Sequence, residues 1–233
     1  MAIHYFIWNG TNSLNKHIRV PNRIPVIRPE ERQEQITIPG RSGELIQTEG
    51  DEVYNSYIHT VDISIDGAEN IRAAENWLKG GGKVTFDSQP TLEQDARVYG
   101  SISLGKHSRN IDRWKGTGQF YCSPIKRAIN EQTITVTTSG TTINNPGDMT
   151  AYPLIEITGS GAITVKIGLK TLSIPECVSG WVIDSENEWI LSGNTPQGNV
   201  CSGQFPVLEK GENTITFTGN ITSLLITPRF RYL

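Results

Sequence analysis

The sequence predicts a mainly β protein made of two domains, an N-terminal β-sandwich-like domain with one α-helix and a smaller C-terminal β-sandwich. Three observations support this fold class. Thr, Ile, Val, Gly and Asn recur through 233 residues, of which 23 are Gly and only 2 are Met. Short apolar runs alternate with turn residues, as strands and reversals require. Helical spacing of apolar residues occurs convincingly in a single segment.

The clearest strand is 57–65, in which apolar and polar residues alternate. Tyr57, His59, Val61, Ile63 and Ile65 fall on one face, and the polar residues between them fall mostly on the other. This alternation is typical of a half-buried antiparallel strand. Further short strands of the first half are expected at 1–8, 18–20, 24–27, 35–38, 84–86, 96–104 and 116–122.

The helix is expected at 67–79, where Ala68, Ile71, Ala74 and Leu78 recur at helical spacing. Asp66, with Glu69 three residues later, predicts a start that resembles a capping box. The glycines 80–82 are expected to end the helix, because glycine tolerates the left-handed conformation of a C-terminal cap.

The second half consists of strands and turns. We expect a domain boundary near residue 130, next to a stretch rich in Thr, Ser and Asn, which gives domains of 1–130 and 131–233. At the end of the chain, the turn 209–212 and the pair Gly219–Asn220 predict a meander of separate short strands. The other expected strands are 154–158, 163–167, 171–174, 181–184, 188–191, 213–218 and 221–227.

Charge and cysteine content restrict the function. The net charge is −3 and no run of Lys and Arg occurs, which argues against tight binding of DNA or RNA. Three scattered cysteines predict reduced thiols, although Cys177 and Cys201 could pair if their strands are adjacent. The apolar segment 1–8 is short and lacks a basic region, so we interpret it as a strand and not as a signal peptide. No segment is long enough to span a membrane.

Two groups of residues near position 185 could form a catalytic site or a sugar-binding site. Asp184, Glu186 and Glu188 stand at alternate positions and could serve a glycosidase as acid and base, but a solvated hairpin turn explains them more simply. Trp181 and Trp189 flank this turn and could stack on a sugar, whereas large aromatic residues of a sandwich usually belong to the core.

The remaining candidates also have plain structural explanations. His4, His17, His59 and His107 are dispersed without the spacing of metal ligands, so no metal site is expected. The run from Gly80 to Lys83 follows a helix, whereas a phosphate-binding loop precedes one. Arg41 lies in the turn 39–43, where a role in subunit contact is a hypothesis. We therefore expect no catalytic, cofactor-binding or metal-binding residues.

Several segments, in order along the chain, resemble the distal tail protein family of siphophages. The first is Ile38-Pro39-Gly40-Arg41-Ser42-Gly43-Glu44-Leu45, followed by Gly50 and Tyr54. Each match is only a turn with a strand, but together they extend from about residue 3 to the end. The other matching segments are 71–78, 85–87, 96–100, 118–124, 145–147, 152–153, 157–161, 182–185, 205–208 and 211–213.

The resemblance implies a structural virion protein and not an enzyme, with no cofactor. In that family the N-terminal domain assembles into a hexameric ring and a galectin-like C-terminal sandwich projects from it. The ring would connect the tail tube protein to the hub of the tail tip or baseplate and leave a channel for DNA ejection. Such a chain would be assembled in the bacterial host cytoplasm, from a phage or a prophage, and reside at the distal end of the virion tail.

The alternative is a carbohydrate-binding module of a phage tail that adheres to the host. It would bind host glycans through the tryptophans near position 185, and a receptor-binding protein is a further possible partner. The chain has no long insertion that would encode an extra carbohydrate-binding module, which makes the structural role the preferred reading.

Overall fold

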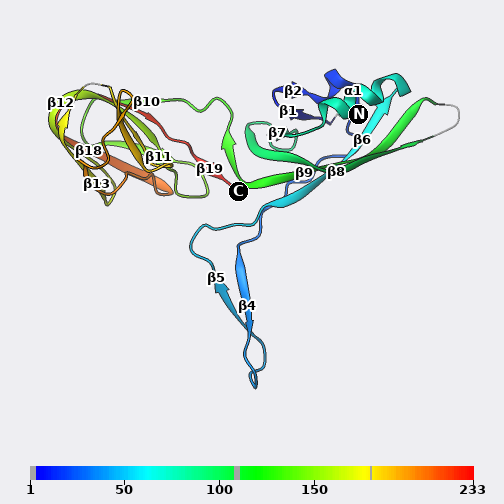
Figure 1. Cartoon of the computed structure of the whole chain (residues 1–233), viewed down its shortest axis with the longest axis horizontal. Coiled ribbons are helices and arrows are strands. Elements are labelled where there is room, and N and C mark those ends of the chain that lie inside the picture. Colours follow the sequence, from blue (N-terminus) through cyan, green and yellow to red (C-terminus); the bar gives the residue numbers. More distant parts are fainter. Residues whose placement is uncertain (1–3, 108–110, 179) are drawn as a thin grey trace. The chain divides into compact units, whose positions relative to one another are not determined.

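The computed structural model describes residues 4–107, 111–178 and 180–233, and it divides into two compact units. Unit 1 comprises Met1–Lys126 with Leu233, and unit 2 comprises Arg127–Tyr232. Strands dominate both units, and a single α-helix occurs in the described residues, so the mainly β fold class is confirmed (Figure 1).

The strands of unit 1 form one curled sheet with the order β2-β1-β7-β8-β9-β6-β3. The first ten residues of β9 pair with β6, from Asp66–Arg113 to Tyr57–Cys122, without interruption. The bounds are β1 Phe6–Trp8, β2 Thr11–Asn12, β3 Ile18–Arg19, β6 Tyr57–Asp66, β7 Gly81–Phe86, β8 Leu92–Lys106 and β9 Arg113–Ala128.

The alternation predicted for 57–65 is confirmed, because His59, Val61, Ile63 and Ile65 are buried while Ile58, Thr60 and Asp62 are exposed. The buried side chains face a core in which aromatic rings pack edge to face. Phe6 and Phe120 have ring centroids 5.3 Å apart, and Phe6 also stacks on Trp77 of the helix. The helix therefore covers the inner face of the sheet, as its apolar spacing predicts.

The helix itself is shorter than predicted and starts differently. A 3-10 turn over Ala68–Asn70 leads into α1, Ile71–Trp77. The predicted capping box is wrong, because Asp66 ends β6 and its carboxylate binds Arg113 and Arg19. The free N–H of Ala68 instead donates to Asp112, from the loop before β9, at 2.9 Å. A residue 44 positions away thus supplies the cap, which no local motif could reveal. Gly80, with φ of +77°, follows the helix as expected.

Two further short strands form a separate hairpin. β4, Gln33–Thr37, and β5, Glu44–Thr48, pair only with each other in a two-stranded sheet. The strand expected at 35–38 is thereby confirmed, whereas 24–27 forms no strand. β5 was not predicted.

Unit 2 is a sandwich whose two layers share two long, bent strands. β12, Leu154–Ile167, pairs with β18, Gly211–Thr227, along nearly its entire length. On its other edge, β12 pairs with two strands. Its first residues pair with β14, which pairs in turn with β15, and its last residues pair with β13. The other bounds are β10 Ile134–Val136, β11 Thr141–Asn145, β13 Lys170–Cys177, β14 Trp181–Asp184, β15 Trp189–Ser192, β16 Thr195–Pro196, β17 Ser202–Gly203 and β19 Arg231–Tyr232.

The predicted meander of separate strands is therefore wrong. Segments 154–158 and 163–167 are one strand, and so are 213–218 and 221–227. The glycines between them are bulges and not turns, since the register of β12 against β18 shifts after Thr158 and again after Ser160. Leu208 forms only an isolated bridge with Ala151, so it does not belong to a hairpin with β18.

A candidate assembly surface

The β4–β5 hairpin extends away from the other strands of unit 1 (Figure 1). All ten residues of its two strands are exposed except Ile36, which is half-buried. Ile36 and Leu45 are register partners, and Ile38 follows two residues further on the same side. Leu45 is 41% exposed and Ile38 38%. Ile46, which pairs with Gln35 on the opposite side, is 58% exposed.

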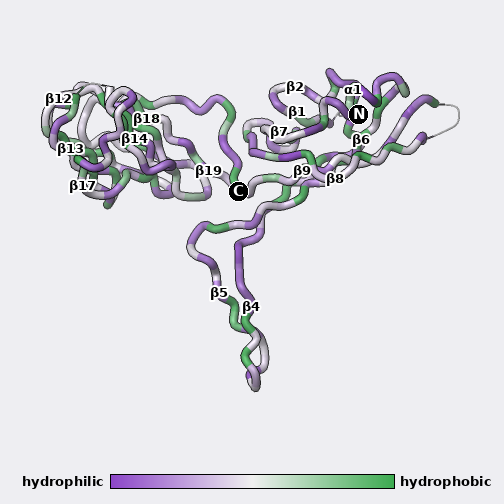
Figure 2. The backbone as a smooth tube through the Cα atoms, viewed as in Figure 1, coloured by the Kyte–Doolittle hydropathy of each residue, from purple (hydrophilic) through white to green (hydrophobic). Residues whose placement is uncertain are grey.

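Figure 2 shows hydrophobic colour in the outer part of this hairpin, where strands of a monomer are usually polar. A two-stranded hairpin without a core is at best marginally stable in water. The apolar side of the hairpin is thus a surface that contact with another protein would stabilise.

The hairpin is closed by the turn of the sequence motif. Gly40 and Gly43 have φ of +81° and +83°, and the N–H of Arg41 donates to the carbonyl of Ile38 at 3.1 Å. Arg41 is exposed at the tip. At the base, the N–H of Arg32 donates to Val53 at 2.9 Å, and its side chain lies 3.6 Å from Glu49. The hairpin is therefore held by backbone hydrogen bonds at both ends, and it presents the side chain of Arg41 at its tip.

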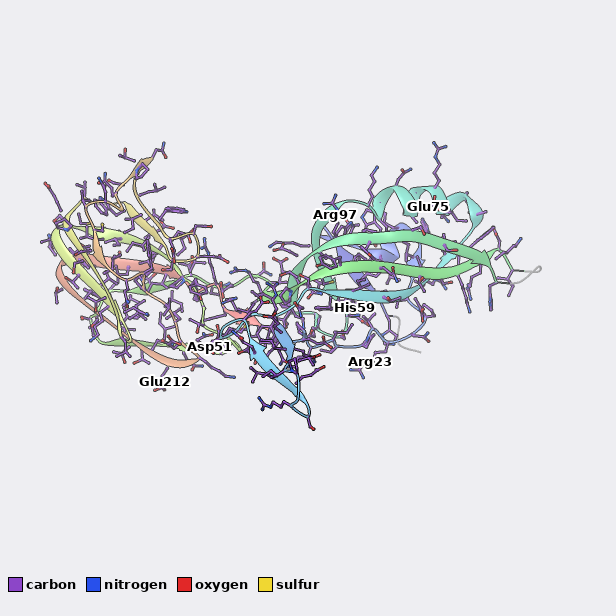
Figure 3. The ribbon with its side chains drawn as sticks, turned by 60° about the horizontal axis from the view of Figure 1, so that its bottom comes forward. Arg23, Asp51, His59, Glu75, Arg97 and Glu212 are labelled. Atoms are coloured by element: carbon purple, nitrogen blue, oxygen red, sulfur yellow. The ribbon has the colours of Figure 1, made fainter. Side chains whose placement is uncertain are left out.

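The outer face of the large sheet carries a second exposed apolar group. Ile58 of β6 pairs with Tyr121 of β9, and the ring of Tyr121 lies 6.2 Å from that of Tyr99 of β8. Tyr99 is 50% exposed, Tyr121 47% and Ile58 44%. A row of three large side chains thus crosses three strands on the face opposite the core, with Arg97 exposed two residues from Tyr99 (Figure 3).

The acidic turn between β14 and β15 is part of an ion-pair network. Asp184 is 2% exposed and accepts hydrogen bonds from both terminal nitrogens of Arg229, at 2.7 and 3.2 Å. Burial alone would raise the pKa of the Asp184 carboxyl, but the hydrogen bonds from Arg229 and Asn187 outweigh burial and lower it. Glu186 pairs with Arg127. The predicted solvated turn is thus wrong for Asp184, because that carboxylate is buried and neutralised by Arg229.

The two tryptophans beside this turn have different environments. Trp181 is 3% exposed and belongs to the core of unit 2, which confirms the core interpretation for this residue. Trp189 is half-buried on an open hollow of about 460 Å³, next to Glu188, Pro196 and Asn199. A paired platform of two exposed tryptophans is therefore absent from this turn.

The other sequence candidates remain separate in the structure. His59 is buried in the core of unit 1, whereas Nδ1 of His4 is hydrogen-bonded to the carboxylate of Asp87 at 2.5 Å. His17 caps a 3-10 turn, and His107 follows β8. Within the described residues, no three His, Cys, Asp or Glu side chains gather in a way that could hold a metal ion.

The three cysteines are free thiols. Cys122 lies in the core of unit 1, while Cys177 and Cys201 lie in or against the core of unit 2. Burial raises the pKa of all three, to about 12 for Cys122. Among the described helices, none is long and apolar enough to cross a membrane.

The fold of the chain is similar to that of a phage protein of known structure. Searches with the sequence match no family model and no curated protein. The structure matches the crystal structure of the SPP1 Dit protein (gp 19.1), described as a paradigm of the hub adsorption apparatus in phages that infect Gram-positive bacteria. The TM-score is 0.76 at 18% identity, and 100% of each chain is covered.

Proposed function

We propose that this chain is a distal tail protein, a structural component of a phage tail that assembles as a hexameric ring. The ring would join the tail tube protein to the hub of the tail tip or baseplate and keep a channel open for DNA. It would be assembled in the bacterial host cytoplasm and reside at the distal end of the virion tail. The observation that carries this proposal is the full-length likeness to SPP1 Dit in both units, including their order.

The exposed surfaces of unit 1 support assembly into a ring. A closed ring of identical subunits needs a heterologous interface, in which each subunit presents two different patches. The apolar side of the β4–β5 hairpin and the row Ile58–Tyr121–Tyr99 are candidates for these two patches, because each exposes large apolar side chains.

Light scattering of the purified chain, with negative-stain images of the same fraction, tests this function. Six copies of a 25.8 kDa chain give a mass of about 155 kDa, and the particles should be rings. If the free chain is monomeric, the same measurement is repeated with the tube and hub proteins of its own tail. A failure to form rings under both conditions would disprove the adaptor role.

A variant tests the contribution of the hairpin. Leu45→Asp places a charge on the apolar side of the arm and should reduce the ring fraction at least tenfold, because the charge would have to be desolvated in the interface. Gln33→Asp, which lies beside Thr48 on the opposite side of the same hairpin, is the matched control and should assemble normally. Equal assembly of both variants would exclude the hairpin from the interface.

The alternative function, adhesion to host glycans, retains one supporting observation. The half-buried ring of Trp189 lines a hollow with a carboxylate and an amide, which are groups that can bind sugar hydroxyls. Binding of the monomer to purified cell wall, abolished by Trp189→Ala, would favour this function.

A further inference from the structure

The first and last segments of unit 2 are both attached to the β14–β15 turn. Arg127, the first residue of the unit, forms an ion pair with Glu186 of the turn. Arg229, near the end of the unit, binds Asp184 through two hydrogen bonds and lies 3.4 Å from Glu186. One short acidic turn therefore holds side chains from residues that are 102 positions apart in the chain.

Glu131 connects the two segments directly. One of its carboxylate oxygens accepts the backbone N–H of Arg229 and the other accepts that of Phe230, each at 2.7 Å. Two charge-assisted hydrogen bonds from consecutive N–H groups are a strong attachment. The first segment thus reaches the last segment without involving the turn.

The backbone of Arg229 indicates that this arrangement is enforced. Its φ of +56° is uncommon for a residue with a side chain and persists where surrounding contacts determine it. The preceding Pro228 offers no N–H, so the N–H groups of residues 229 and 230 are the first donors available after it. Glu131 takes both.

We propose that Arg127, Glu131, Asp184, Glu186 and Arg229 form a junction latch, a network that holds the first and last segments of unit 2 as one coupled element. When the junction latch is intact, both connections of unit 2 are fixed on its β14–β15 turn. When it opens, both segments are released together from the β14–β15 turn while the sandwich stays folded. Asp184 and Glu186, which the sequence offered as catalytic acids, would thus control the release of these two segments.

Limited trypsin digestion of the full chain tests the coupling, because trypsin cleaves after Arg127 and after Arg229. In Glu131→Gln, the amide NH₂ replaces one acceptor oxygen and faces an N–H donor, so the attachment to residues 229 and 230 should fail. We expect cleavage at both arginines to rise at least tenfold, measured by mass spectrometry of the fragments. Glu156→Gln, an exposed position on β12, is the matched control and should leave both rates unchanged.

A second variant keeps the test decisive if Glu131→Gln unfolds unit 2. Glu186→Gln removes a partly exposed charge at the other end of the junction latch and should raise both cleavage rates about threefold with an unchanged circular dichroism spectrum. Acceleration at both arginines supports the junction latch. Unchanged rates, or acceleration at Arg127 alone, would overturn it, because the two segments would then be held independently.

Discussion

The imidazole of His59 lies against the phenyl ring of Phe86, with ring centroids 4.1 Å apart and planes inclined by 34°. His59 is 2% exposed, and neither of its ring nitrogens has a hydrogen-bond partner among the described residues. Burial and the nearby charge of Lys126 lower its pKa to about 4. The core of unit 1 therefore favours the neutral form of this histidine.

This environment predicts that unit 1 loses stability in mild acid. Below a pH of about 6.5 the unfolded chain protonates His59 while the folded chain does not, so the free energy of unfolding falls until the folded pKa near 4 is reached. The full effect is about 3 kcal/mol, since each unit of pKa difference corresponds to about 1.4 kcal/mol.

Urea denaturation at pH 7.0, 5.5 and 4.5 measures this loss. His59→Phe keeps an aromatic ring against Phe86 but cannot titrate, so its stability should change much less over this range. Parallel pH profiles of the two proteins would contradict the assignment, whatever their absolute stabilities.

A second prediction concerns the buried ion pair of unit 2. Arg229→Met removes the cation from a carboxylate that is 2% exposed, and it should lower the free energy of unfolding by about 3 kcal/mol. Adding Asp184→Asn should restore part of that loss, because no charge is then left unpaired in the interior. Additive effects of the two changes in a double-mutant cycle would show that the residues are not coupled.

A third prediction separates backbone strain from steric contact at two glycines with nearly equal φ. A Cβ on Gly219, at φ +92°, would lie 2.3 Å from the carbonyl oxygen of Ala162, whereas one on Gly140, at φ +95°, meets nothing within 4 Å. Gly140→Ala should cost about 1–2 kcal/mol for its φ alone. Gly219→Ala should cost clearly more. Thermal unfolding of both variants provides the comparison, and equal losses would mean that β12 and β18 can separate at this point.

The fourth prediction concerns the exposed tip of the hairpin. If Arg41 contacts a neighbouring subunit, Arg41→Ala should reduce the fraction of ring-shaped particles in light scattering and negative stain. Arg23→Ala, an exposed change outside the hairpin (Figure 3), serves as the control. Ring formation near the wild-type level in Arg41→Ala would remove this residue from the interface.

The fold could be predicted where local pattern and burial agree. The sequence predicts β6 correctly because its apolar and polar residues alternate as one face of the sheet is buried and the other exposed. It predicts the helix because the apolar residues of that segment share one side. The sequence predicts separate strands on either side of Gly159 and Gly219, whereas both glycines lie in bends of continuous strands, because a glycine in a bulge and a glycine in a turn look alike in sequence. β5 lacked a core-facing pattern because it packs on nothing in its own chain.

The sites were harder to predict than the fold. The acidic residues at 184–188 were noticed, but their partners Arg127 and Arg229 lie 57 and 45 positions from Asp184, and spacing carries no information about them. Asp112 at the helix start is a similar case. Such long-range pairs follow from sheet topology, which a single sequence leaves open.

The bent strands of unit 2 have a mechanical consequence. β18 binds β11 with its first half and β10 with its second, while β12 binds β13 and β14 in the same divided way. Neither layer can separate alone, because both long strands continue from one layer into the other. A pulling force on unit 2 would therefore have to break the pairing of β12 with β18 in both layers at once.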